Sequence, residues 1–90
     1  MNLRQQLDAI VAEAMVTAGC EPGTPAVVKP AGRPEFGHYQ ANGIMGAAKK
    51  AGNNPRQLAE QVVTALETTG SDMIARLEVA GPGFINIHLH

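Results

Sequence analysis

The fold is decided by the C-terminal stretch, which reads Ala-Gly-Pro-Gly-Phe-Ile-Asn-Ile-His-Leu-His over residues 80–90. Apolar and other residues alternate strictly after the Gly-Pro-Gly turn, which predicts a strand over 84–90. One face of that strand carries only aliphatic side chains and can close a core. The other carries an aromatic ring, an amide and two imidazoles, which suit contacts to a nucleotide base better than burial. These four residues are Phe84, Asn86, His88 and His90.

The segments that precede this strand predict a helix followed by another strand. Asn54 is placed to cap a helix, with Pro55 at its first position and Gln57 at the capping-box position. An apolar stripe continues to Leu66, and Gly70 is expected to end the helix. Residues 73–79 then alternate, which predicts the next strand.

The N-terminal half predicts two helices separated by short extended segments. An amphipathic stripe over 3–18, capped by Asn2 and ended at Gly19, predicts the first helix. A loop over 20–25, a strand over 26–29 closed by Pro30, a turn over 31–34 and an extended segment over 36–40 follow. The Ala/Gly-rich stretch from residue 41 predicts a helix ending at Gly52.

The resulting order of elements is helix, two strands, two helices, two strands. This order predicts a two-layer α+β fold, in which helices pack on one face of a four-stranded antiparallel sheet. Ninety residues suit one domain, over 1–90. Because the strand pattern runs to His90 with no turn or cap after it, we expect the chain to be a piece of a longer protein.

Composition restricts the partners and the chemistry. The net charge of −1 lacks the basic excess of an independent nucleic-acid-binding domain, so any RNA contact should be weak and aided by other parts of a larger protein. The single cysteine, Cys20, cannot form an internal disulfide, and no segment resembles a signal peptide or membrane span. We therefore expect a cytoplasmic protein with no membrane or DNA partner.

No catalytic motif is recognisable in the chain. His88 and His90 have no cysteine or carboxylate at matching spacing, so a metal site is not expected. The glycines of the 81–83 turn precede a strand instead of a helix, which argues against a phosphate loop. No cofactor is expected in this chain.

Short segments in a fixed order resemble the N-terminal additional domain of bacterial arginyl-tRNA synthetase, over essentially the whole chain. They read Phe-Gly-His-Tyr-Gln-Ala-Asn-Gly over 36–43, Ala-Lys-Lys over 48–50, Asn-Pro-Arg-Gln-Leu-Ala over 54–59 and Ala-Gly-Pro-Gly-Phe-Ile-Asn-Ile over 80–87. The ATP-binding motifs of this synthetase class are absent, and residues 88–90 should not be mistaken for one.

The resemblance implies a role in protein biosynthesis. The parent would be an arginine–tRNA ligase that uses ATP and arginine, while this chain alone would be inactive. The domain would bind the D-loop of arginine tRNA and position it for the catalytic domain of the same polypeptide. Phe84 and Asn86 match the aromatic residue and the amide that meet the base in this family.

Other candidate RNA contacts have equally ordinary interpretations. The segment over 36–40 is favoured as a glycine-dependent bend that packs Phe36 and Tyr39 on the core. The basic residues could meet phosphates or be simple solvated helix ends. A structural spacer docked on the catalytic body, without base readout, is the alternative function; it fits the near-neutral charge and the Ala/Gly-rich helix. The additional candidates are Tyr39, Gln40, Lys49, Lys50, Arg56 and His88.

Overall fold

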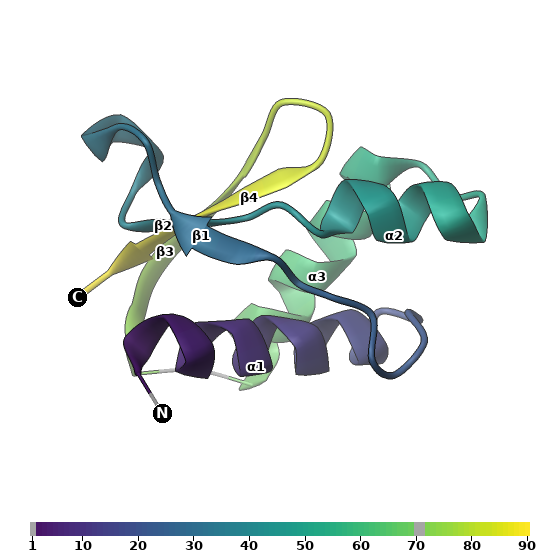
Figure 1. Cartoon of the computed structure of the whole chain (residues 1–90), viewed down its shortest axis with the longest axis horizontal. Coiled ribbons are helices and arrows are strands. Elements are labelled where there is room, and N and C mark those ends of the chain that lie inside the picture. Colours follow the sequence, from purple (N-terminus) through teal and green to yellow (C-terminus); the bar gives the residue numbers. More distant parts are fainter. Residues whose placement is uncertain (1, 70–71) are drawn as a thin grey trace.

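A four-stranded antiparallel sheet forms one layer of the computed structural model, which describes residues 2–69 and 72–90 (Figure 1). The strand order is β1-β2-β4-β3, so β4 lies between β2 and β3. The predicted α+β class and order of elements are confirmed. The strands are β1 (Val28–Pro30), β2 (Tyr39–Ala41), β3 (Ile74–Ala80) and β4 (Phe84–Leu89).

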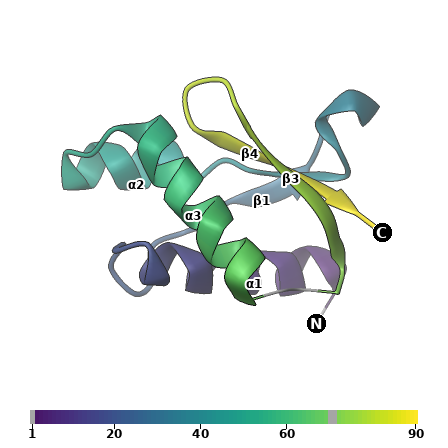
Figure 2. The ribbon, with the colours of Figure 1, turned by 180° about the vertical axis from the view of Figure 1, so that it is seen from behind.

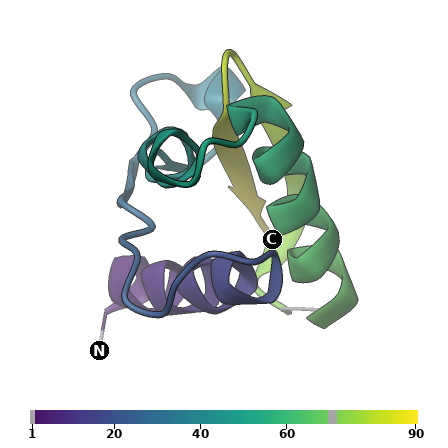
Figure 3. The ribbon, with the colours of Figure 1, turned by 90° about the vertical axis from the view of Figure 1, so that its right-hand side faces the viewer.

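In the part of the chain that the structure describes, three α-helices and one short 3-10 helix accompany the sheet. Helix α3 runs diagonally between α2 and α1 when the molecule is seen from behind (Figure 2). In the view in which α2 is seen end-on, α1 and α3 lie on two sides of it (Figure 3). The elements are α1 (Leu3–Thr17), η1 (Pro34–Phe36), α2 (Ile44–Ala51) and α3 (Pro55–Thr69).

The core lies between the helices and the aliphatic face of β4. Ile85 and Ile87 are completely buried, as the alternation predicts, and Leu89 packs at the margin of the core. Burying an aliphatic side chain of this size contributes about 1.5–3 kcal/mol, which makes β4 a main source of stability. The helices add Leu7, Val11, Ala14, Met15, Ile44, Ala48, Leu58, Ala59, Val62, Ala65 and Leu66 to this core.

Local sequence signals fix the helix ends. The Asn2 side chain accepts from the backbone N–H of Gln5, and the Gln5 side chain accepts from the Asn2 N–H, which forms a capping box. Asn54 caps α3 by accepting from the N–H groups of Arg56 and Gln57. Gly52 ends α2 in the left-handed conformation, as predicted. The expected stop at Gly70 lies outside the described residues.

Helix α1 also covers part of the sheet edge formed by β1. The N–H of Val28 donates to Oδ2 of Asp8 over 3.2 Å, and Nη1 of Arg4 donates to the Val28 carbonyl over 3.4 Å. Nη1 of Arg4 lies 3.6 Å from Oδ2 of Asp8, one helical turn away. Because Pro30 has no N–H, β1 offers little to which another strand could pair.

Three predicted boundaries are wrong. The strand expected over 26–29 covers Val28–Pro30 instead, since Val27 has a φ of 52° and interrupts the extended backbone before it. The segment over 36–40 is not one extended piece: η1 ends at Phe36, Gly37 turns the chain with a φ of 91°, and β2 begins at Tyr39. The helix expected from residue 41 begins only at Ile44, because Ala41 pairs with β1 and β4 and continues the sheet.

Gly43 lies where the chain passes from β2 into α2, in close contact with the preceding loop. A Cβ at this position would overlap the backbone oxygens of Pro25 and Ala26. Three residues further on, a Cβ at Gly46 would meet nothing within 4 Å. The two glycines thus form a matched pair with opposite expectations.

We predict that Gly43→Ala lowers the free energy of unfolding by about 2 kcal/mol, the cost of forcing atoms into a packed site. Gly46→Ala should raise it by roughly 0.5–1 kcal/mol, because alanine is the better helix former. Urea unfolding followed by circular dichroism measures both. Equal effects of the two substitutions would contradict the close contact at Gly43.

Candidate nucleic-acid interface

The sheet face opposite the buried isoleucines carries a row of polar residues across all four strands. Gln40 is paired with Asn86, Asn86 with Glu78, and Lys29 with Gln40. Paired residues of neighbouring strands point to the same face, so these four side chains lie side by side. We call Lys29, Gln40, Asn86 and Glu78 the polar row.

Asn86 is buried, although it lies on the face without helices. It is only 4% exposed, which the sequence did not predict for a residue on the open face. The reason is its central strand: the side chains of Gln40 and Glu78 flank it on both sides. Nε2 of Gln40 donates to Oδ1 of Asn86 over 2.7 Å. A ligand can therefore reach only the outer edge of this amide.

Phe84 is the first residue of β4, directly after the β3–β4 turn, and lies two residues before Asn86 on the same face. Its ring is half-buried and close to Gly81, where a Cβ would lie 3.6 Å from the ring. Gly83 is packed on α3, since a Cβ there would lie 2.9 Å from that of Pro55. Nη1 of Arg56 donates to the Gly81 carbonyl over 2.9 Å. The start of α3 thereby holds the turn that positions the aromatic ring.

His88 continues the same face but is already engaged by neighbouring charges. Its Nε2 lies 2.7 Å from Oε1 of Glu78 and 3.3 Å from Nη2 of Arg76. Its side chain is 16% exposed. His88 is therefore best described as part of a charged cluster on β3 and β4. Sequence analysis missed Arg76 and Glu78, because only the strand order brings them beside β4.

Tyr39 and Phe36 behave differently from each other. Tyr39 is paired with Ile87 and packs against the core, so it faces the helices and not the polar row. This agrees with the structural interpretation of its segment. Phe36, which was expected on the core as well, is 38% exposed. The chain bends directly after η1 at Gly37, where a Cβ would lie 2.6 Å from the Ile87 carbonyl oxygen.

The three basic candidates do not share one location. Arg56 contacts the β3–β4 turn, close to Phe84. Lys49 and Lys50 are exposed in the last turn of α2, and Lys50 borders a pocket beside the loop at Cys20 and Glu21. Their possible phosphate contacts thus stay a prediction. Burial raises the pKa of the Cys20 thiol above its ordinary value, which makes it a weak nucleophile near neutral pH.

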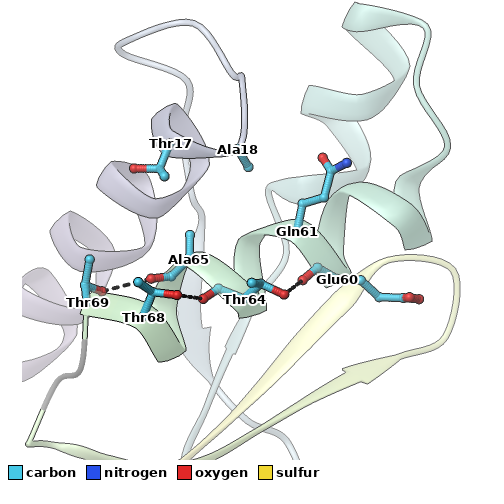
Figure 4. A pocket seen from close by; sticks show the side chains of 8 residues that line it. All are labelled: Thr17, Ala18, Glu60, Gln61, Thr64, Ala65, Thr68 and Thr69. Carbon is cyan, nitrogen blue, oxygen red and sulfur yellow. Dashed lines mark hydrogen bonds between the residues drawn. The ribbon is translucent and has the colours of Figure 1, made fainter.

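A further pocket lies between the end of α1 and α3 (Figure 4). Its threonine hydroxyls are occupied within the helix: Thr64 donates to the Glu60 carbonyl and Thr68 to that of Thr64. Apart from these threonines, the polar side chains that line the pocket are those of Glu60 and Gln61. Within 2–69 and 72–90, no three His, Cys, Asp or Glu residues are grouped to hold a metal ion. In the same ranges no helix is long and apolar enough to cross a membrane.

The fold and the face of the sheet together define a small α+β domain with amides and an aromatic ring on an uncovered sheet, an arrangement that proteins use to bind RNA bases. Residues 1–89 match the family model described as the arginyl tRNA synthetase N-terminal domain. The chain belongs to this family.

Relatives and solved structures agree with this assignment. The chain is 53% identical over 89 residues to the arginine–tRNA ligase of Hahella chejuensis and 55% identical over 89 residues to that of Chromobacterium violaceum. These matches cover 99% of the chain but only 15% of each relative. The fold is similar to part of the arginyl-tRNA synthetases of Plasmodium falciparum and Thermus thermophilus, with TM-scores of 0.84 and 0.81 at 20% and 22% identity. These two matches cover 98% and 99% of the chain, and 16% and 14% of the structures.

We predict that Arg56→Gln loosens the β3–β4 turn, because the Gly81 carbonyl loses its charged donor. Amide hydrogen exchange at Gly81, Gly83 and Phe84 should become several-fold faster, in line with a loss of about 1 kcal/mol or less for a surface hydrogen bond. Lys50→Gln removes the same charge without touching the turn and serves as the control. Unchanged exchange in Arg56→Gln would show that Gly83 packing alone holds the turn.

Proposed function

We propose that this chain is the tRNA-binding domain of an arginine–tRNA ligase and that it contacts the D-loop of arginine tRNA through Phe84 and Asn86. Residues 1–90 form the N-terminal unit of a longer cytoplasmic enzyme in this proposal. The catalytic domain of that enzyme binds ATP and arginine and joins arginine to the tRNA. The domain positions the tRNA for that reaction.

The observation that carries this proposal is the juxtaposition of a half-buried ring and a buried amide on the sheet face without helices. An aromatic ring at the end of a strand can stack on a base, and stacking contributes about 1–3 kcal/mol per base. In this proposal Asn86, which lies two residues further along the same face, meets the edge of the stacked base. Together the two side chains supply a stacking surface and a hydrogen-bonding group.

Charge supports a role in positioning over one in anchoring. The net charge is −1, and Glu78 lies within the polar row itself. Phosphate contacts dominate the affinity of most RNA-binding proteins, and here few are available. Lys49, Lys50 and Arg56 add at most isolated phosphate contacts around the helix junction. The domain should bind weakly by itself and rely on the rest of the ligase.

The first test is a titration of the isotope-labelled chain with arginine-accepting tRNA at low salt, followed by NMR. The amides of Phe84 and Asn86 should shift with the native tRNA, and much less with a tRNA altered in its D-loop. Phe84→Ala should weaken binding about tenfold, the lower part of the range for a lost stack.

Phe36→Ala is the matched control, because Phe36 is exposed on η1 and does not lie on β4. It should leave the affinity and the D-loop preference as they are. Equal losses in both variants would contradict the assignment of Phe84. If only scattered lysines shift, and equally for both tRNAs, the domain acts as a structural spacer on the catalytic body.

A further inference from the structure

Gln40 has a specific task in the polar row. We infer that Gln40 is a positioning residue that turns the Asn86 amide so that its NH₂ group lies on the β3 side of the polar row and is left for the ligand, and that the site therefore takes a base edge offering a hydrogen-bond acceptor. This inference rests on the proposed function for the ligand and on the polar row for the orientation. It assigns a polarity to the site as well as a location.

The side-chain amides of Gln40 and Asn86 are joined by a hydrogen bond. Nε2 of Gln40 donates to Oδ1 of Asn86 over 2.7 Å, so the oxygen of Asn86 faces β2. An amide has its oxygen and nitrogen on opposite branches of one planar group. Fixing the oxygen toward β2 therefore turns the nitrogen away from β2.

The polar row has opposite charges at its two ends. Lys29 stands at the β1 end and Glu78 at the β3 end, with the two amides between them. A cation on one side and a carboxylate on the other favour amide dipoles whose oxygens point toward Lys29 and whose nitrogens point toward Glu78. The Gln40–Asn86 bond has this direction. The opposite orientation would turn the Asn86 oxygen toward a carboxylate.

The side-chain nitrogen of Asn86 is left unpaired by the part of the chain that the structure describes, but accessible. Among the described residues, Asn42 Oδ1 is the only side-chain nitrogen or oxygen that is completely buried without a partner. Nδ2 of Asn86 has no hydrogen-bond partner in these same residues, so it keeps an opening to the surface. A buried amide gains most from a ligand that satisfies its remaining donor.

The orientation of the Asn86 amide determines which edge of a bound base it can meet. With Oδ1 already accepting from Gln40, the donor is the group of Asn86 that is left to read a ligand. It fits an unprotonated ring nitrogen or a carbonyl oxygen on the edge of a base stacked on Phe84. A base that presents only an N–H or amino group at that point would leave two donors opposed.

Gln40→Glu tests the orientation, because a carboxylate accepts and cannot donate. The Asn86 amide must then rotate, donate Nδ2–H to residue 40 and place its oxygen, instead of its NH₂ group, on the β3 side of the polar row. In the ligand-free chain, NMR should show the side-chain NH₂ resonance of Asn86 moving downfield in Gln40→Glu, with no such shift in Gln40→Leu. Dispersed backbone spectra of both variants establish that they fold.

Titration with arginine-accepting tRNA tests the consequence for binding. Gln40→Glu should lose about tenfold in affinity for the native tRNA, the scale of one hydrogen bond, and should no longer distinguish it from the D-loop-altered tRNA. Lys49→Gln lowers the net charge by the same amount away from the polar row. It should weaken binding to both tRNAs equally and preserve their ratio.

An unchanged Asn86 resonance in Gln40→Glu would overturn the positioning role. So would a preserved tRNA preference together with a rotated amide. If the amide rotates while the wild-type chain binds neither tRNA, the positioning role is supported and the proposed RNA site is overturned.

Discussion

The rest of the structure depends on the central position of β4. Its neighbours β2 and β3 satisfy its backbone from both sides, and its alternate side chains serve opposite purposes. Ile85 and Ile87 are completely buried under the helices, while Asn86 between them faces the other side. A shift of register by one residue would exchange these roles and place an amide in the apolar core. The packing that stabilises the domain is therefore also what turns Asn86 and Phe84 to the sheet face without helices.

The β3–β4 turn links this strand to the helical layer. Gly83 is packed on Pro55, and Arg56 donates to the Gly81 carbonyl, so the first residues of α3 contact the turn. The same Asn54 that caps α3 fixes where these residues begin. A local signal for helix initiation thus determines where an aromatic ring lies on the far side of the sheet.

Much of this arrangement could be predicted from sequence because its signals are local. The alternation over 84–90, the caps at Asn2 and Asn54 and the glycine at the end of α2 each act within a few residues. The burial of Asn86 could not be predicted, since its partner Gln40 is 46 residues away and becomes its neighbour only through the strand order. The same holds for Glu78 beside His88. Family resemblance pointed to Phe84 and Asn86, but it did not contain the polar row that surrounds them.

Burial and charge together define what such a site can contribute. An amide that is 4% exposed costs stability unless its polar atoms are paired, and Gln40 pairs only the oxygen. Because the Gln40 bond holds the amide in one orientation, a ligand that pairs the nitrogen would cost little additional side-chain entropy. A surface with a net charge of −1 supplies little of the phosphate attraction that brings RNA to a protein. Under the proposed function, a preorganised amide beside an aromatic ring in a nearly neutral domain would discriminate between bases, while other parts of the ligase would hold the tRNA.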